Sequence, residues 1–333
     1  MISDSYANRG QGFIADDIEQ GDLPANVQVT GPNGEDWDFP SGGIDEGRAM
    51  LQIVHDVAPG ADLAFRTGAV SASDFAQGIR DLADANCDII VDDLTFLTEP
   101  FYGGGLVDQA VTEVVSNGVS YFTSAGNFGD DGYEAVYSEA TDGTTTYHSF
   151  NGEAYNEVYL EKGDYLIVLQ WSDWFYSDEP SVSGSPDGAD HDFDIYLHDE
   201  NGNRLFGFNR NNIGGDPVEV LPFTVNSDNV TARIVIEYDG SDSDIQVPLS
   251  SVKLKYVAFR SGKGFDQKHK DGNGTIVGHA TNEFAITVGA TAYNDISKVE
   301  SFSSRGGSLS NELGFGIPNI VGPDGGYTSV GLR

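Results

Sequence analysis

The pattern of hydrophobic and polar positions changes character along the chain. In the first 140 residues, apolar positions recur at helical spacing in the segments 47–56, 73–85 and 107–117. Short apolar runs typical of buried strands alternate with them at 62–66, 87–96 and 119–127. Strands that alternate with helices of this length predict an α/β fold, in which helices cover a parallel sheet.

A different pattern begins at about residue 141, where apolar and polar positions alternate with a period of two. The runs that show it are 164–171, 192–199, 219–225, 232–239 and 252–259. Turn signals separate these runs, which predicts antiparallel strands of a β-sandwich or jelly-roll-like module. The first pattern returns after Gly264. We therefore predict an α/β core over 1–140 and 264–333, interrupted by an inserted β-module over 141–263.

The net charge of the chain excludes some classes of binding partner. The chain has 17 Lys and Arg against 53 Asp and Glu, a formal net charge of −36. Nucleic-acid binding through phosphates needs a cationic surface, so we expect no nucleic acid and no anionic membrane as partners. Net charge of this size favours a monomer, and high salt would screen its self-repulsion. Because the acids are spread along the whole chain, we expect a halophilic source. The single cysteine, Cys87, excludes a disulfide framework.

Four stretches, taken in order, resemble subtilisin-like serine proteases (subtilases). They are ISDSY at 2–6, DEGRAMLQIVHDVAPGA at 45–61, DIIVDDLTF with GVSYFTSAGN at 88–96 and 118–127, and the run from FAITVGA to PNIVGPDGG at 284–326. The resemblance implies a subtilisin-like parallel sheet with helices on both faces and a serine endopeptidase acting on polypeptides. It also implies that Asp4 is the triad aspartate, that Asn127 is the oxyanion-hole asparagine and that the protein is extracellular, although no signal peptide is visible.

The chain departs from the subtilase pattern in two places. Glu46 occupies the position of the catalytic histidine, and no Gly-Thr-Ser-x-Ala segment, which would supply the serine nucleophile, follows. We therefore expect a fragment, or a reading frame broken by a premature stop or frameshift, that is inactive by itself.

Glu46 is the candidate for the catalytic base. Apolar residues follow it at helical spacing, which predicts that Glu46 begins the buried face of its helix; they are Ala49, Met50, Ile53, Val54 and Val57. Burial and a nearby Asp4 would raise the pKa of Glu46. Sedolisins, acid-active relatives of subtilases, use a glutamate in this role, but Met50 stands where their second helix carboxylate is expected. The alternative is that Asp45 is the N-cap and Glu46 a first-turn acid that complements the helix dipole.

Other polar residues are weaker candidates. Asp93 falls where the family has a substrate-lining serine and would add a third carboxylate to the site. Asn127 is alternatively a turn asparagine in a glycine-rich loop. His55 lies half a turn out of phase with Glu46, and we interpret His279 as structural.

Alternate carboxylates in the β-module raise the possibility of a metal site. Asp190, Asp192 and Asp194 alternate along one predicted strand, and with Asp173 or Asp199 they could hold Ca²⁺, although chance clustering in so acidic a chain is the alternative. We expect no cofactor to be required.

Three functions remain open at this point. The first is a subtilase-like serine endopeptidase domain that cleaves peptide bonds by acyl transfer, with Asp4, Glu46 and Asn127 as catalytic residues. The second is a non-catalytic binding protein that uses the β-module. The third is an acid serine-carboxyl protease of the sedolisin type.

Overall fold

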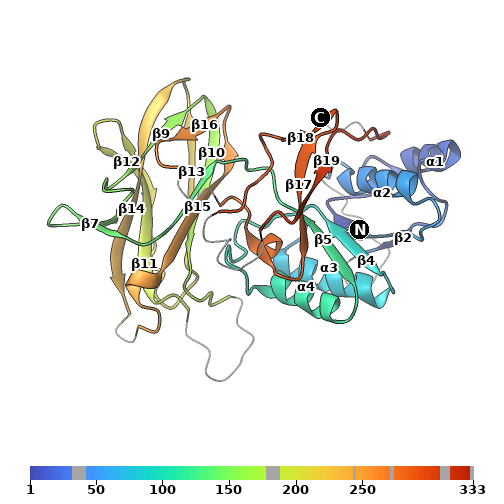
Figure 1. Cartoon of the computed structure of the whole chain (residues 1–333), viewed down its shortest axis with the longest axis horizontal. Coiled ribbons are helices and arrows are strands. Elements are labelled where there is room, and N and C mark those ends of the chain that lie inside the picture. The colour runs from blue at the N-terminus through green and yellow to red at the C-terminus, as the bar shows by residue number, and fades with distance from the viewer. Residues whose placement is uncertain (32–42, 178–187, 243–244, 271–273, 308–315, 331–333) are drawn as a thin grey trace.

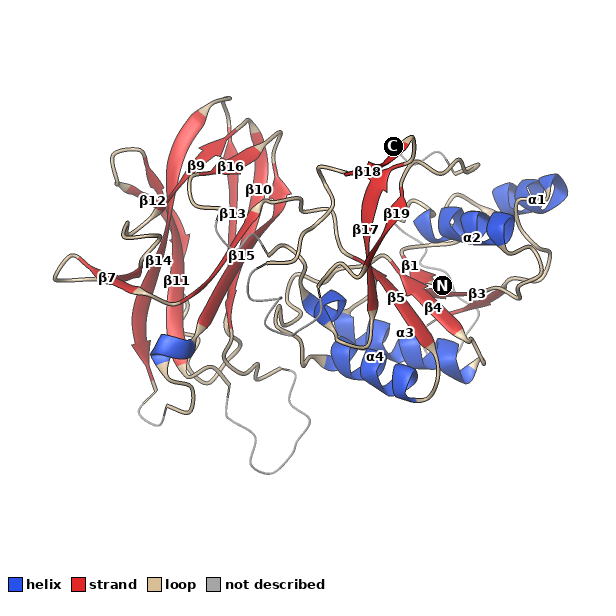
Figure 2. Ribbon diagram, viewed as in Figure 1, coloured by secondary structure: helices blue, strands red, loops and turns tan. Residues whose placement is uncertain are grey.

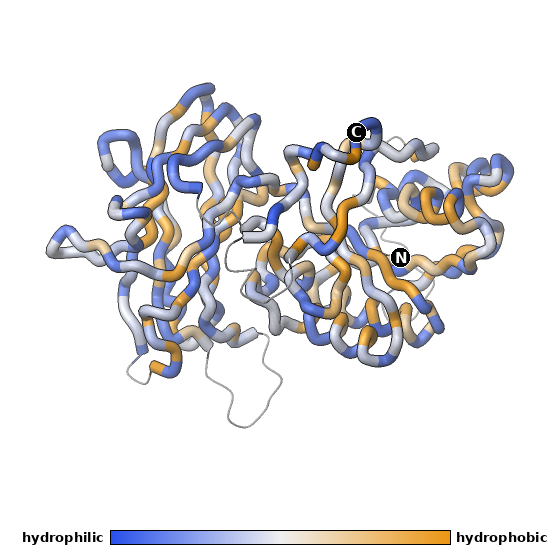
Figure 3. The backbone as a smooth tube through the Cα atoms, in the orientation of Figure 1, coloured by the Kyte–Doolittle hydropathy of each residue, from blue (hydrophilic) through white to orange (hydrophobic). Residues whose placement is uncertain are grey.

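The chain folds into an α/β part and a β-sandwich that lie side by side (Figure 1). The computed structural model describes residues 1–31, 43–177, 188–242, 245–270, 274–307 and 316–330. Apolar residues concentrate in the strands of both parts and along the helices of the α/β part (Figure 3). No helix in these described ranges is both long and apolar enough to cross a membrane.

An eight-stranded, mostly parallel sheet forms the centre of the α/β part. Its strands follow the order β18 (Asp295–Val299), β17 (Ile286–Ala292), β5 (Ser120–Ser124), β4 (Ile89–Asp92), β1 (Ile2–Ser3), β3 (Ala64–Thr67) and β2 (Gln28–Thr30), and β19 (Ile320–Pro323) also pairs with β17. Helices α1 (Gln11–Gln20) and α2 (Glu46–Val57) lie on one side of the sheet, and α3 (Ala72–Asp84) and α4 (Leu106–Ser116) lie on the other (Figure 2). The predicted α/β class is confirmed.

The two helices α3 and α4 bury the apolar faces that their spacing predicts. Phe75, Ile79 and Leu82 of α3 pack with α4 and with residues of β1 and β4 in one core cluster. The side chain of Ser71 caps α3 by accepting a hydrogen bond from the backbone N–H of Asp74 at 3.2 Å. Helix packing and capping agree here, so local sequence is enough to place these elements.

The predicted buried face of α2 is confirmed at Ala49, which is buried, and at Met50 and Val54, which pack against the core, but it is wrong at Ile53 and Val57. Val57 is 83% exposed and Ile53 is 43% exposed, whereas Arg48 and Gln52 are buried. Two contacts explain the rotation of the helix. Gly47 lets the backbone approach the ring of Phe65, where a Cβ would come within 2.3 Å. The buried polar residues also find partners, since Arg48 pairs with Asp17 and Asp45, so their burial carries no unpaired charge.

The β-sandwich consists of two antiparallel sheets. One sheet has the order β13 (Val218–Val225), β10 (Gly163–Trp171), β15 (Lys253–Ser261) and β6 (Gly132–Val136). The other has β12 (Arg204–Phe208), β11 (His191–Asp199), β14 (Val230–Ser241), β8 (Thr146–His148) and β7 (Glu139–Thr141), with β9 (Asn156–Leu160) and β16 (Phe265–Gln267) attached. A single apolar cluster, which includes Phe150, Trp171 and Phe193, fills the space between them.

The sandwich strands run from Gly132 to Gln267, around the 141–263 range of the sequence prediction. Short 3₁₀ helices at Leu249–Ser251 (η2) and Gly278–Thr281 (η3) complete the described elements. Pro222 lies on β13, an edge strand, where the missing N–H disrupts no central pairing.

Candidate functional site

The topology of the parallel sheet brings three predicted site residues to one edge. Strands β1, β4 and β5 are parallel neighbours, with Ile2 paired to Asp92 and Asp92 paired to Thr123. Asp4, Asp93 and Asn127 each follow one of these strands. In open α/β sheets, functional groups gather beyond the carboxyl ends of the strands, which is where these side chains come.

Asp4 caps helix α2 from a distant part of the chain. Its Oδ1 accepts hydrogen bonds from the backbone N–H groups of Glu46 at 2.9 Å and Gly47 at 3.3 Å. Its Oδ2 accepts from the N–H of Ile44 at 2.6 Å. The carboxylate therefore satisfies otherwise unpaired donors and faces the positive end of the helix dipole.

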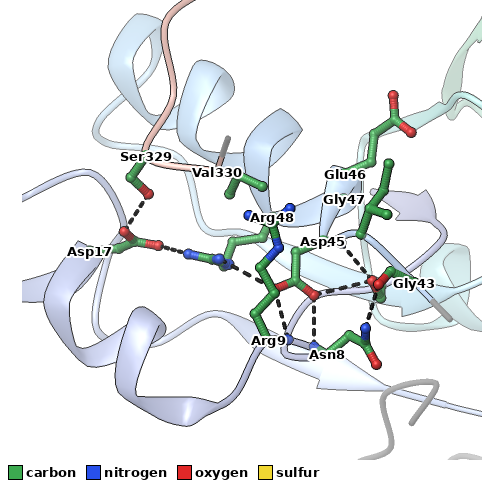
Figure 4. Close-up of polar contacts among 12 residues, drawn as sticks. Asn8, Arg9, Asp17, Gly43, Asp45, Glu46, Gly47, Arg48, Ser329 and Val330 are labelled. Carbon is green, nitrogen blue, oxygen red and sulfur yellow. Dashed lines mark hydrogen bonds and ion pairs between the residues drawn. The ribbon is translucent and has the colours of Figure 1, made fainter. Parts of the chain in front are cut away.

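Asp45 stands at the N-cap position, but its side chain does not cap the helix. Its backbone is left-handed, with φ of 62°, and no side-chain cap bond forms. The carboxylate instead accepts from the N–H groups of Asn8 at 2.7 Å and Arg9 at 3.1 Å. It also pairs with Arg48, which bridges to Asp17 (Figure 4). The side-chain N-cap expected of Asp45 is thus replaced by Asp4.

Glu46 is half-buried and begins α2 beside Asp4. Its side chain points away from the Arg48 network (Figure 4), and it forms no hydrogen bond with any residue in the described part of the chain. Burial, and then the charge of Asp4, raise the pKa of Glu46 above its ordinary value. The Glu46 carboxylate therefore has increased basicity and is not engaged by the side chains that the structure describes.

Asp93 adds a third carboxylate to this edge. Its Oδ2 accepts a hydrogen bond from Ser3 Oγ at 2.9 Å, and its Oδ1 is buried without a hydrogen-bond partner. Burial, and then the charge of Glu46, raise the pKa of Asp93 well above its ordinary value. Burial thus disfavours the ionised form of Asp93.

No cation balances these three carboxylates within the described residues. None of the ion pairs formed there includes Asp4, Glu46 or Asp93. The raised pKa values of Glu46 and Asp93 are consistent with this lack of a neutralising cation.

Asn127 lies on the loop between β5 and β6. The residue is exposed, and its amide makes no hydrogen bond with a described residue. The loop around it is fixed, because the N–H of Phe128 donates to Ser304 Oγ at 3.0 Å and the N–H of Gly129 donates to the Phe302 carbonyl at 2.8 Å. A free amide on a fixed loop is available to donate to a bound ligand.

A buried network on the opposite face of β4 was not predicted from the sequence. The His279 ring lies between Glu99, at 3.0 Å from Nδ1, and Asp92, at 3.2 Å from Nε2. Burial favours a lower pKa for His279, but the charges of Glu99 and Asp92 outweigh it and raise the pKa well above its ordinary value. We interpreted His279 as structural, but nothing in the spacing of Glu99 indicated that it would be the partner.

The three aspartates of the predicted Ca²⁺ site each have their own partners. Asp190 accepts from the N–H groups of residues 246 and 247, Asp192 from the N–H of Asn212 at 3.1 Å, and Asp194 from the Tyr196 hydroxyl at 3.0 Å. Burial is the main cause that raises the pKa of Asp194 to about 6. In the described residues, no group of three or more His, Cys, Asp or Glu is arranged to hold a metal ion. The geometry therefore offers no support for Ca²⁺ at these aspartates.

Comparisons with known proteins add little to this geometry. No protein-family model matches the chain, and no curated protein matches it either. Two solved structures of β-glucosidase from Kluyveromyces marxianus, one in complex with glucose and one selenomethionine-labelled, align at 12% and 14% identity with TM-scores of 0.20 and 0.17. The alignments cover 82% of this chain but 39% and 38% of those chains, so this chain spans well under half their length. Such low TM-scores support no argument about fold or activity.

Proposed function

We propose that this chain carries part of the active site of a subtilase-like serine endopeptidase, with Glu46 as the general base. Glu46 would take the proton of a serine hydroxyl as the serine attacks the peptide carbonyl, and Asn127 would donate to the oxyanion that forms. The observation that carries the proposal is the Glu46 carboxylate, which has no hydrogen-bond partner among the described residues and lies close enough to Asp4 and Asp93 to interact with both electrostatically.

The roles of the three carboxylates differ. Asp4 is engaged by backbone N–H groups, so it holds the start of α2 in place and raises the basicity of Glu46 through its charge. Asp93, directly after β4, supplies a second acid close to Glu46, in the manner that sedolisins use a carboxylate on the helix. This arrangement favours a pH optimum more acidic than that of histidine-based enzymes. Polypeptides are the proposed substrate and the extracellular space the proposed location.

The test is hydrolysis of casein between pH 3 and 10. It requires a polypeptide that contains both this chain and a Gly-Thr-Ser-x-Ala segment, because the printed sequence contains none. We expect Glu46→Gln to lower kcat about a hundredfold or more, as for the loss of a general base. The matched control is Glu19→Gln, at an exposed position of α1, which should leave kcat unchanged.

An alkaline optimum together with full activity of Glu46→Gln would refute the proposal. Hydrolysis by the 333-residue chain alone that a serine-protease inhibitor abolishes would contradict the nucleophile assignment. A polypeptide that has the segment but shows no hydrolysis would favour a non-catalytic binding protein.

A further inference from the structure

The β-sandwich meets the α/β part at the loops that flank the candidate site. The sheet of β13, β10, β15 and β6 lies on the side of the sandwich next to the α/β part (Figure 1). Residues of both parts form one apolar cluster, whose buried members are Phe101, Val168, Val218, Val257 and Val277. The sandwich is therefore packed against the α/β part and is not a module tethered by free linkers.

A single side chain of the sandwich, Gln170 on β10, holds the 97–102 loop. This fully buried amide accepts the N–H of Phe101 at Oε1, at 2.8 Å, and donates from Nε2 to the carbonyl of Glu99 at 3.0 Å and to that of Leu97 at 3.4 Å. The loop begins four residues after Asp93. One N–H group and two carbonyl groups of its backbone thus hydrogen-bond to the inserted part.

A second side chain, Phe259 on β15, touches both loops. Its ring centroid lies 5.8 Å from that of Phe101 and 4.7 Å from that of Phe128. Phe128 is the residue after Asn127, so the aromatic contact lies next to the proposed oxyanion donor. The edge-to-face arrangement of Phe128 and Phe259 is one that aromatic rings favour.

The loop that carries Asn127 is also the covalent link between the two parts. It leaves β5, contains Gly126 and Gly129 at positive φ, and enters β6, which pairs with β15. Glycines at positive φ make such a link conformationally free unless outside contacts restrain it. Ile276, where the chain has returned to the α/β part, is held too. Buried Lys255 of the sandwich donates to its carbonyl at 3.2 Å and also pairs with Glu134 at 2.7 Å.

We infer that the β-sandwich braces the candidate site, and that Gln170 and Phe259 are positioning residues that fix the 97–102 and 125–131 loops. A donor amide contributes to oxyanion stabilisation only if its location is set before the reaction, and the scaffold that sets it here is the inserted part. The effect of these contacts on catalysis rests on the proposed function. Their effect on the order of the two loops is independent of it.

Amide hydrogen exchange of the 97–102 and 125–131 segments tests the brace without any substrate. Gln170→Leu should accelerate exchange in the 97–102 segment, and Phe259→Leu should accelerate it in both segments, by about tenfold each, because local opening becomes easier when its restraints are removed. The matched control is Phe223→Leu in the same sandwich, where the ring stacks on Tyr165 at 4.9 Å and touches neither loop. The control should leave exchange in the two segments within about twofold of the wild type.

A conservative variant separates positioning from general stability. Phe259→Tyr keeps the ring and should restore wild-type exchange, since Phe259 is only partly buried and leaves room for a hydroxyl. In the active polypeptide, Phe259→Leu should lower kcat about tenfold and leave KM within about twofold, the signature of a contact that matters in the transition state.

The outcomes are distinguishable from those of the catalytic proposal. Unchanged exchange in both test variants overturns the brace, and so does an equal acceleration in Phe223→Leu, because the effect would then reflect sandwich stability alone. Loosened loops combined with a Glu46→Gln variant that hydrolyses casein normally would support the brace and refute the catalytic role of Glu46.

Discussion

Asp92, the last residue of β4, and Asp93, which follows it, are neighbours in sequence, yet their carboxylates lie in opposite electrostatic environments. Asp92 lies on the α3 side, where it contacts His279 and accepts from Thr123 Oγ1 at 3.1 Å. Asp93 lies on the α2 side among Glu46 and Asp4, with Ser3 as its one hydrogen-bond donor in the described residues. One face stabilises negative charge with a buried imidazolium, and the other concentrates negative charge without a cation.

The difference shows how a fold separates a structural polar network from a reactive one. A buried charge is tolerated when a partner neutralises it, as His279 does between Asp92 and Glu99. Carboxylates that lack such a partner keep raised pKa values and so remain able to accept or release a proton. Charge balance on one face and imbalance on the other make the Asp4–Glu46–Asp93 edge the functional candidate.

The largest expected effect is a loss of stability in Asp92→Asn. Removing one charge of a buried network leaves the imidazolium of His279 poorly compensated, which should lower the free energy of unfolding by about 3 kcal/mol. Urea denaturation at pH 6 measures the change. A loss close to zero would mean that Glu99 alone neutralises His279.

The same variant should change the pH dependence. The raised pKa of His279 contributes stability that is fully present below its unfolded-state pKa of about 6.5 and is lost as pH rises through its folded-state pKa. Asp92 is one of the two charges that raise this pKa, so the alkaline loss should be smaller and should end at a lower pH in Asp92→Asn than in the wild type.

A smaller effect of opposite sign is expected from Asp93→Asn. Because the pKa of Asp93 is raised in the folded state, wild-type stability falls as pH rises above the unfolded-state value of about 3.9. The amide cannot ionise, so the variant should gain about 1 kcal/mol at pH 7, and the gain should vanish below about pH 4. Thermal unfolding followed across this pH range measures it. A destabilised variant at pH 7 would show that the Asp93 side of β4 does stabilise a charge.

The smallest effect should come from Ser3→Ala. The Ser3 hydroxyl favours the ionised form of Asp93, so its loss should raise the pKa of Asp93 further and cost about 0.5 kcal/mol for one hydrogen bond. The pKa is measured by following the Asp93 carboxyl carbon in an NMR titration. In an Asp93→Asn background, Ser3→Ala should lower the free energy of unfolding by less than it does in the wild type, because no ionised form of Asp93 remains to be stabilised.

Part of this arrangement could be predicted from the sequence. The helical spacing of Phe75, Ile79 and Leu82 indicated α3 and its buried face, because packing there follows local pattern. The resemblance to subtilases grouped Asp4, Asp93 and Asn127 in one candidate site, and parallel pairing of β1, β4 and β5 brings them to one sheet edge. Only part of the buried face of α2 could be predicted, because Arg48 and Gln52 are buried through partners that lie far away in the chain.

Local pattern by itself determined the α/β class and the antiparallel strands of the inserted part, because strand and helix periodicity reflect short-range burial. Only the tertiary structure decided that Asp4 caps α2, that His279 neutralises Asp92 but not Asp93, and that Gln170 and Phe259 hold the loops of the site. Each of these contacts joins residues at least 40 positions apart in the chain. Such pairings depend on how separate elements pack, and no local period in a single sequence specifies them.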